Sequence, residues 1–439
     1  MPARPQQLNV AHVLRGNWLG SLAVALVTLA AALLVSAAAA VATAVAGTDI
    51  DSRWDLQPRQ IVTDTASMLV RSLGGEVAVT SSDTDYSLHA ANLTITLVTL
   101  GVLVLSFRRM VRGYPRWTAA IGEVVRVSAF LSLALVVLAL TTRASLENVQ
   151  TVTVGAPFDP GSDDRWGPGA VSAGLVGFFV PCFVLLLAGL RSEWWDGRGR
   201  AVVRVIGAAV RGVAVIAVLL PVCGIVAIVL REVSEDEFRY ADMDPGVRTV
   251  AIVDDVLSLP NQGWNLIALG SGAEVGIRTS FGDDEESEMH RLDWYVSEGD
   301  LPYQIAYPVD DGHPWLAAAP AVLALVLVAG AVVAGRTSRG TAPLWVRLGG
   351  WAVAVGVGTP LLTLLSASRS SSEDSVDRDG FTFFQGADVL QTFLFVTGAA
   401  LVVGALGALL FGRRDLPLGP AWQSMRSLQQ NPSRPPGSE

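Results

Sequence analysis

The residues best suited to chemistry lie in one apolar stretch, residues 246–281, that also carries charge and a helix break. Asp254 and Asp255 are adjacent carboxylates, and the break at Pro260 and Asn261 follows a few residues later. Such carboxylates could bind a cation or a proton, because ionisable groups at membrane depth are usually functional. The sequence favours the plainer interpretation, in which both carboxylates are solvated on an outer surface.

The same stretch is expected to form a broken hairpin near 247–275. Pro260 lacks a backbone donor and disfavours helical geometry at Leu259, while the nearby glycines permit tight turns. Freed backbone groups at membrane depth are tolerated only against protein or in a water-filled cavity. We therefore expect a cavity open to the outside, with these candidate lining residues: Asp254, Asp255, Pro260, Asn261, Trp264 and Asn265.

The sequence lacks the motifs of most other catalytic and ligand-binding sites. All 31 basic residues are arginine, which excludes a Walker A lysine and a Schiff-base lysine, and there is no HExxH, CxxC or GxSxG motif. The four histidines are scattered, and Cys182 and Cys223 lie in apolar runs where they pack as small hydrophobes. The acidic run 283–286 lacks the ligand spacing of a calcium loop. We expect no enzymatic activity, no cofactor, no metal and no nucleic-acid partner.

The elements that must position the candidate residues are membrane spans. The chain has 439 residues, a mean hydropathy of +0.46 and 51% hydrophobic residues, which is too apolar for an ordinary soluble protein. The sequence predicts an all-α integral membrane fold with eight transmembrane helices: Trp18–Ala46, Leu88–Phe107, a third with its core at Val127–Thr141, Gly169–Leu190, a fifth ending near Leu230, Trp315–Ala334, Val346–Leu365 and Ala387–Phe411.

The polar segments divide the chain. Residues 1–17 are expected in the cytoplasm, followed by spans 1–5 over 18–230, an acidic outer region over 231–313, spans 6–8 over 314–411 and a disordered cytoplasmic tail over 412–439. Acidic outer loops at 47–87 and 142–168 interrupt the first group, and Gln60–Leu73 has the apolar face of a short helix on the membrane surface. Spans 2–3, 4–5 and 6–7 are expected to form hairpins with short Arg-bearing links. An uncleaved first span is favoured over a signal peptide.

Charge asymmetry sets the expected topology. If the 247–275 segment does not cross, one side of the membrane holds 19 Arg and 5 acidic residues, and the other holds 12 Arg and 35 acidic residues. Arg-rich short loops mark the cytoplasmic side, so we expect a plasma-membrane protein with both termini in the cytoplasm. The segment then either dips into the bilayer as a re-entrant hairpin or lies on the outer surface.

Two stretches of the chain resemble a known family. LNVAHVLRGNWLGS (8–21) precedes the first span, and LSLPNQGWNLIALGSGAEV (257–275) contains the break. Both resemble the streptophobe-like family of actinobacterial multi-pass membrane proteins, and the Arg-only, Ala-rich composition also suggests GC-rich coding. The resemblance implies the multi-pass architecture and no particular reaction. Some relatives carry a zinc ribbon ahead of the first stretch, and we do not expect a role of that ribbon here.

Three functions remain open at this level. The first is a transporter- or channel-like scaffold with a polar, outward-facing cavity at the Pro–Asn break. The second is a non-transporting envelope scaffold or regulatory protein whose outer loops form a compact subdomain that binds a protein or small molecule. The third and weakest is a membrane-embedded enzyme, which would need a second reactive group within hydrogen-bond reach of Asp254 and Asp255.

Overall fold

The structure is a computed structural model of the full chain. It describes residues 16–48, 58–80, 84–114, 117–145, 165–189, 194–195, 197–234, 245–273, 275–281, 289–290, 318–337, 342–374 and 381–411. The N-terminal residues before 16, most of the acidic outer segments and the tail predicted over 412–439 lie outside these ranges.

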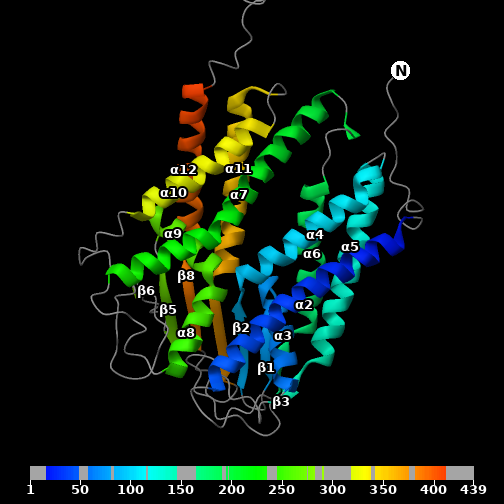
Figure 1. The fold of residues 1–439 in the computed structure, drawn as a ribbon, viewed down its shortest axis with the longest axis vertical. Helices are drawn as coiled ribbons and strands as arrows, with labels where there is room; N and C mark the ends of the chain where they lie inside the picture. Colours follow the sequence, from blue (N-terminus) through cyan, green and yellow to red (C-terminus); the bar gives the residue numbers. More distant parts are fainter. Residues whose placement is uncertain are drawn as a thin grey trace, which may run out of the picture.

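Eight of the described helices are long and apolar enough to cross a membrane, as predicted. Their apolar side chains face outward over much of their length, as expected where lipid rather than water surrounds a bundle. Figure 1 shows that the start of the first and the end of the last both lie away from the strands. The eight are α2 (Trp18–Thr48), α4 (Leu93–Met110), α5 (Trp117–Thr141), α6 (Ala170–Gly189), α7 (Gly197–Ser234), α10 (Ala318–Thr337), α11 (Leu344–Ser366) and α12 (Val389–Phe411).

The closest helix pairs differ from the predicted Arg-linked hairpins. α5 packs most closely on α6, and α11 on α12, although each pair is joined through outer segments. Small residues explain the choice of partner, because they let helix backbones approach. The Ser132 hydroxyl of α5 donates to the Gly174 carbonyl of α6 at 2.7 Å, and a Cβ on Gly356 of α11 would lie 3.0 Å from Thr397 of α12.

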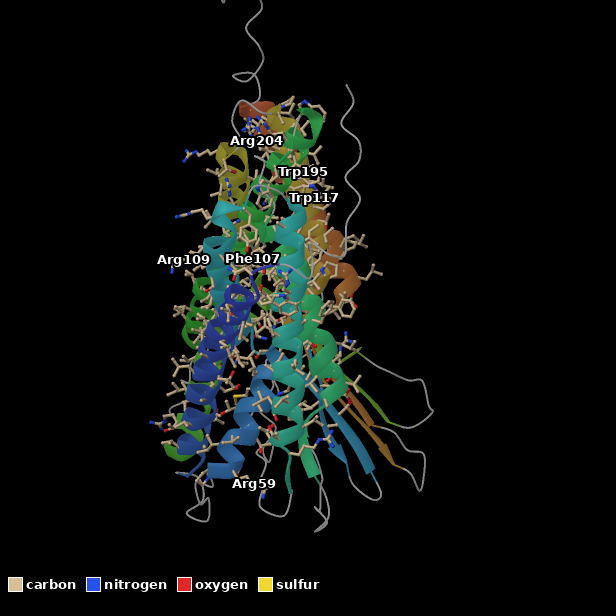
Figure 2. All side chains as sticks on the ribbon, turned by 90° about the vertical axis from the view of Figure 1, so that its right-hand side faces the viewer. Arg59, Phe107, Arg109, Trp117, Trp195 and Arg204 are labelled. Atoms are coloured by element: carbon tan, nitrogen blue, oxygen red, sulfur yellow. The ribbon has the colours of Figure 1, made fainter. Side chains whose placement is uncertain are left out.

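The segments between the membrane spans at one end of the molecule form an eight-stranded antiparallel sheet that was not predicted. Its strand order is β3-β4-β1-β2-β7-β8-β5-β6, and its strands occupy the end of the molecule opposite the start of α2 (Figures 1 and 2). The strands are β1 (Val77–Thr80), β2 (Thr84–Ala90), β3 (Ala144–Ser145), β4 (Arg165–Pro168), β5 (Val275–Phe281), β6 (Met289–His290), β7 (Ser368–Asp374) and β8 (Phe381–Ala387).

The sheet joins the two halves of the chain. β1 to β4 come from the first half and β5 to β8 from the second, and β2 pairs with β7 over seven residues, from Thr84–Asp374 to Ala90–Ser368. Each paired backbone group is removed from water by its partner, so separating the halves at this end would break a continuous ladder. The edge strands β3 and β6 have only two residues each, a length that limits pairing with another chain.

The short helix predicted over 60–73 exists as α3 (Pro58–Ser72), but it packs inside the bundle rather than only on its surface. Leu69 and Val70 of α3 are fully buried in a cluster with side chains of α2, α4, α5 and α6. The Thr63 hydroxyl of α3 also donates to the Thr142 carbonyl at 2.6 Å. The amphipathic pattern therefore matches a protein-facing helix equally well.

The 247–275 segment forms two short helices, α8 (Pro245–Leu257) and α9 (Leu259–Gly270), separated at Ser258. They have 13 and 12 residues, which is about 20 Å each and less than the roughly 30 Å of a bilayer core. Neither is among the helices able to span a membrane. α9 is buried mainly against α7, α10 and α11, and the chain then enters the sheet as β5.

Candidate functional site

Asn261 joins α9 to the ends of two spans. Its side-chain Oδ1 accepts the backbone N–H of Leu93, the first residue of α4, at 3.0 Å. Its Nδ2 donates to the carbonyls of Ala91 at 2.7 Å and of Ser366, the last residue of α11, at 3.3 Å. Helix termini leave backbone groups without intrahelical partners, so the Asn261 amide satisfies such groups on α4 and α11 together.

The two predicted carboxylates have different surroundings. Asp255 is buried, and its Oδ1 accepts the Gln262 side-chain amide at 2.6 Å, which connects the last turn of α8 to the first turn of α9. Gln262 also donates to the Ser258 hydroxyl at 3.2 Å. Asp254 is exposed on α8. The interpretation in which both carboxylates are solvated is wrong for Asp255, whose side chain is buried. Gln262 was missed because nothing in its spacing distinguishes it from a surface glutamine.

The remaining three candidates also lie on α9. Pro260 is buried in the first turn, where a missing N–H costs nothing. The Trp264 indole is 2% exposed and donates to the Thr363 hydroxyl of α11 at 3.1 Å. The Oδ1 of Asn265 is buried and makes no hydrogen bond among the residues that the structure describes. Four of the six residues therefore lie on α9 and two on α8, and Asp255, Asn261 and Trp264 form hydrogen bonds to other elements.

Glycines bring α9 into backbone contact with two spans. A Cβ on Gly263 would overlap the Leu220 carbonyl of α7 and lie 2.9 Å from the backbone nitrogen of Gly224. A Cβ on Gly224 would in turn overlap the Leu259 carbonyl, and one on Gly270 would overlap the Ala319 carbonyl of α10. α9 thus lies against the sheet-side ends of α10 and α11, since Ala319 is in the first turn of α10 and Ser366 ends α11, and against the interior of α7 at Leu220 and Gly224.

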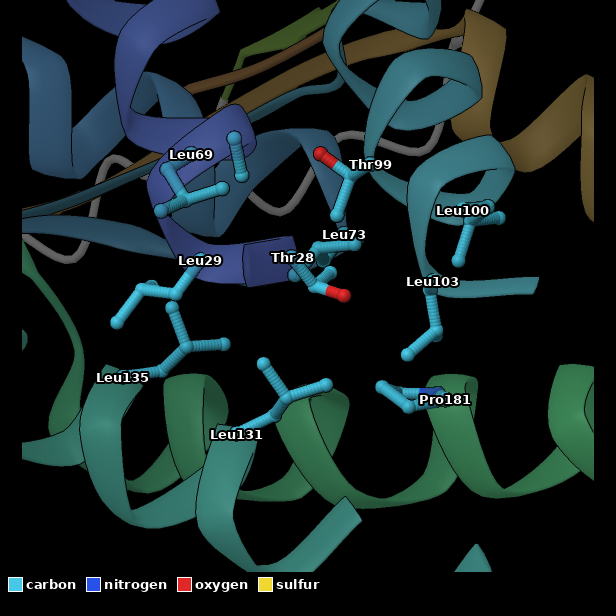
Figure 3. A pocket seen from close by; sticks show the side chains of 11 residues that line it. Thr28, Leu29, Leu69, Leu73, Thr99, Leu100, Leu103, Leu131, Leu135 and Pro181 are labelled. Carbon is cyan, nitrogen blue, oxygen red and sulfur yellow. The ribbon is translucent and has the colours of Figure 1, made fainter. Parts of the chain in front are cut away.

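A cavity in the described part of the chain lies away from α8 and α9, between α2, α3, α4, α5 and α6 (Figure 3). Its volume is about 10 Å³, and none of the six candidate residues lines it. This is roughly the smallest space that holds one water, and an apolar lining leaves such a space dry. It is lined by Thr28, Leu29, Ala32, Leu69, Leu73, Thr99, Leu100, Leu103, Leu131, Leu135 and Pro181. The cavity-lining role of the α9 residues remains a prediction.

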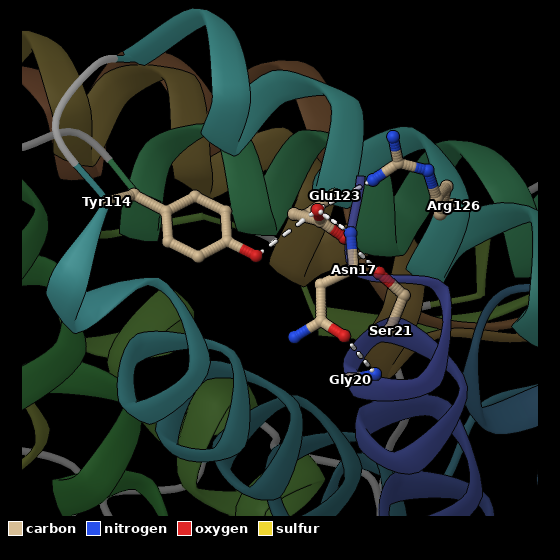
Figure 4. A network of polar contacts seen from close by, with 6 residues as sticks. All are labelled: Asn17, Gly20, Ser21, Tyr114, Glu123 and Arg126. Atoms are coloured by element: carbon tan, nitrogen blue, oxygen red, sulfur yellow. Dashed lines mark hydrogen bonds and ion pairs between the residues drawn. The ribbon is translucent and has the colours of Figure 1, made fainter. Parts of the chain in front are cut away.

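A second buried polar cluster, absent from the candidate list, fixes the start of α2 to α5 (Figure 4). Glu123 of α5 is 1% exposed and forms an ion pair with Arg126, at 2.6 Å from Oε1 to Nη1. The same carboxylate accepts the Asn17 backbone N–H at 2.8 Å, the Tyr114 hydroxyl at 3.2 Å and the Ser21 hydroxyl. Charge-assisted hydrogen bonds of this kind make a buried carboxylate tolerable.

Arg126 completes this cluster on its other side. Its guanidinium lies 5.2 Å from the ring centroid of Trp18, and that ring meets Phe130 edge-on at 5.9 Å. A Cβ on Gly16 would overlap the guanidinium, so the Arg126 side chain would have to shift to admit a larger residue there. The only sequence signal for this cluster is a Glu and an Arg in one turn near the start of an apolar run.

We expect Asn261→Ala to lower the free energy of unfolding by about 2 kcal/mol, because it leaves buried backbone groups of Leu93 and Ala91 without partners. Asn265→Ala, one turn later on α9, is the matched control and is expected to change it by less than about 0.5 kcal/mol. Thermal unfolding in detergent, followed by circular dichroism, measures both. Equal losses for the two variants would contradict a special role of the Asn261 hydrogen bonds.

Comparisons of the chain with protein-family models, curated proteins and solved structures found no match. The class of the protein is therefore inferred from its structure. Eight apolar helices, with a sheet built from the segments that connect them, make this chain a multi-pass integral membrane protein.

Proposed function

We propose that this protein is a non-enzymatic scaffold or regulatory protein of the cell envelope, which uses its outer sheet to hold a partner. The eight spans serve as the anchor, and α9 fixes the spans to the sheet. In this proposal the sheet faces the outside and both termini face the cytoplasm, because seven exposed arginines lie at the end of the spans opposite the sheet, against Arg59, Arg143 and Arg369 at the sheet end.

The pairing of β2 with β7 is the observation that favours a scaffold over a transporter. A transporter opens and closes access to a central site by moving one part of the bundle against another. Here seven consecutive residue pairs connect the two halves at the sheet end, and outward opening between the halves would have to break them. The hydrogen bonds of Asn261 reinforce the same junction, since they join α4 of the first half to α11 of the second.

The transporter- or channel-like alternative requires a water-filled cavity at α9. Buried side chains of Trp264, Leu266 and Ile267 and the backbone contacts of Gly263 fill the faces of α9 that meet α7 and α11. The buried Asp255 is hydrogen-bonded to Gln262, which supports a structural use of this carboxylate. In this proposal α9 connects the ends of α4, α10 and α11 to the interior of α7 and does not line a transport path.

A disulfide across the seam tests this proposal. Ser87 of β2 pairs directly with Ser371 of β7, and directly paired residues in antiparallel strands have Cα separations that a disulfide can bridge. We expect Ser87→Cys/Ser371→Cys to form the disulfide under oxidising conditions. We also expect the oxidised variant to complement a deletion strain of the source organism as well as the wild type does. The Ser87→Cys single variant is the control.

Two results would overturn the scaffold proposal. One is loss of complementation in the oxidised double variant with recovery on reduction, which would show that the halves must separate. The other is solute uptake into liposomes that contain the purified protein and that the disulfide abolishes. A photo-cross-linking residue at the exposed Arg369 of β7, compared with one at Arg109 on the opposite end, identifies the partner in cells.

A further inference from the structure

Arg369 of β7 is held on the sheet by an aromatic ring rather than by a charged partner. Its guanidinium lies 5.2 Å from the ring centroid of Phe384, which is its direct backbone partner on β8. The side chain is exposed, and it forms no hydrogen bond or ion pair with any residue that the structure describes. A guanidinium stacked on a ring keeps its N–H edges available for an oxyanion. Stacking thus orients Arg369 and leaves those edges unused among the described residues.

His89 of β2 lies on the other side of Arg369. The two residues are direct backbone partners across the β2–β7 seam, so their Cβ atoms are about 5 Å apart on one face of the sheet. His89 is half-buried, and it also forms no hydrogen bond or ion pair with a described residue. The register extends the row from Phe384 to Arg278 of β5. Three basic residues and one aromatic residue therefore occupy one row across four adjacent strands.

Hydroxyl residues occupy the register position two residues further along the same four strands. Ser87 shares a face of the sheet with His89, because residues two apart on a strand point to the same side. The register pairs Ser87 with Ser371, Ser371 with Thr382, and Thr382 with Ser280. Hydroxyl donors next to a guanidinium suit a ligand group with several acceptor oxygens.

The row lies just beyond the sheet-side ends of the spans. Arg369 is three residues after Ser366, which ends α11, and His89 is four residues before Leu93, which begins α4. At about 3.3 Å per residue of strand, the row is roughly 10 Å beyond those helix ends. Both solutes and the headgroups of the adjoining lipid leaflet can therefore reach it.

We propose that Arg369 and His89 bind a phosphate group at the seam between β2 and β7, with the Ser87 hydroxyl beside it. A carboxylate has one charge and two oxygens, which Arg369 alone can satisfy, whereas a phosphate monoester has nearly two charges and three acceptor oxygens. The bound phosphate joins β2 of the first half to β7 of the second. Its biological role rests on the proposed scaffold function, because it supplies the ligand chemistry of the sheet, but the binding itself does not.

Phosphate binding to the purified protein in a maltoside detergent tests the proposal. Sodium phosphate is titrated against sodium chloride of equal ionic strength, while the melting temperature and hydrogen exchange over β2 are followed. We expect phosphate to raise the melting temperature and to slow exchange, since a ligand of the folded state stabilises it. Arg369→Gln is expected to weaken binding about tenfold or more, and His89→Gln roughly threefold. Arg59→Gln removes a charge at the same end (Figure 2) and is expected to bind like the wild type.

Substitutions at Phe384, which we assign as a positioning residue, distinguish an oriented arginine from an isolated surface charge. Phe384→Leu keeps an apolar side chain but removes the ring beside the guanidinium, so it is expected to weaken phosphate binding about threefold. Phe384→Tyr keeps the ring and is expected to bind like the wild type. Cooperative melting of each variant without phosphate shows that it folds.

Dioleoyl-phosphatidic acid in phosphatidylcholine nanodiscs identifies the source of the phosphate. Slower exchange over β2 with this lipid, but not with inorganic phosphate, assigns the group to a lipid headgroup, and the reverse result assigns it to a soluble ligand. Equal weakening by Arg369→Gln and Arg59→Gln would overturn the proposal, as would an equal effect of sodium acetate. No response to either phosphate source would also overturn it and would leave the scaffold function standing, because the disulfide across the seam tests that function separately.

Discussion

Glu123→Leu is expected to lower the free energy of unfolding by about 3–5 kcal/mol, because it leaves the Arg126 guanidinium buried without its counter-charge. Arg126 is only 3% exposed and packs between Gly16 and the Trp18 ring, so it cannot reach water without moving the start of α2. The substitution also removes the acceptor of the Asn17 N–H and of the Ser21 hydroxyl. Thermal unfolding in detergent measures the loss, and limited proteolysis at the N-terminus should become faster.

The double variant Glu123→Leu/Arg126→Leu distinguishes an ion-pair effect from a loss of packing. Replacing both charges of a buried pair with apolar side chains is often neutral, so we expect the double variant to recover most of the stability that Glu123→Leu loses. Arg126→Leu completes the cycle. If the stability lost by the double variant equals the sum of the losses in Glu123→Leu and Arg126→Leu, the two side chains are not coupled and this account of the cluster is wrong.

Gly263→Leu is expected to cost about 3 kcal/mol or more and to prevent α9 from seating against α7. Even a Cβ would overlap the Leu220 carbonyl, which is backbone and cannot rotate aside as a side chain could. Overpacking of a tight core typically costs about 1–3 kcal/mol when side chains can adjust, and here a helix must shift. We expect a lower melting temperature and faster hydrogen exchange over 259–270, the region that α9 occupies.

Gly349→Leu on α11 is the matched control, because a Cβ there meets nothing within 4 Å. It introduces the same loss of backbone freedom into a helix and should leave the melting temperature nearly unchanged. An equal loss for the two substitutions would mean that a bulky side chain anywhere in the bundle, rather than the contact of α9 with α7, determines the result, since helix propensity alone favours leucine over glycine.

The sequence alone determined the class, the number of spans and their approximate limits. Long apolar runs leave little choice in a bilayer, because a helix satisfies all its own backbone groups. The run from Trp18 became α2, beginning at the same residue, and the predicted fourth span at 169–190 became α6 over Ala170–Gly189. A break was also predicted, but at Pro260 and Asn261. The structure places it at Ser258, so that Pro260 lies in the first turn of α9, where its missing N–H is tolerated.

Only the tertiary structure decided what the polar residues do. β2 and β7 are almost 300 residues apart, and a strand such as SRSSSED has no apolar alternation of its own, so the sheet could not be predicted from either strand. Likewise the sequence drew attention to Asn261 only as part of the Pro–Asn break, and it gave no indication that Glu123 forms a buried ion pair. Their partners at Leu93, Ser366, Asn17 and Ser21 come from other elements, and a hydrogen bond between distant residues is specified by the packed fold rather than by local sequence.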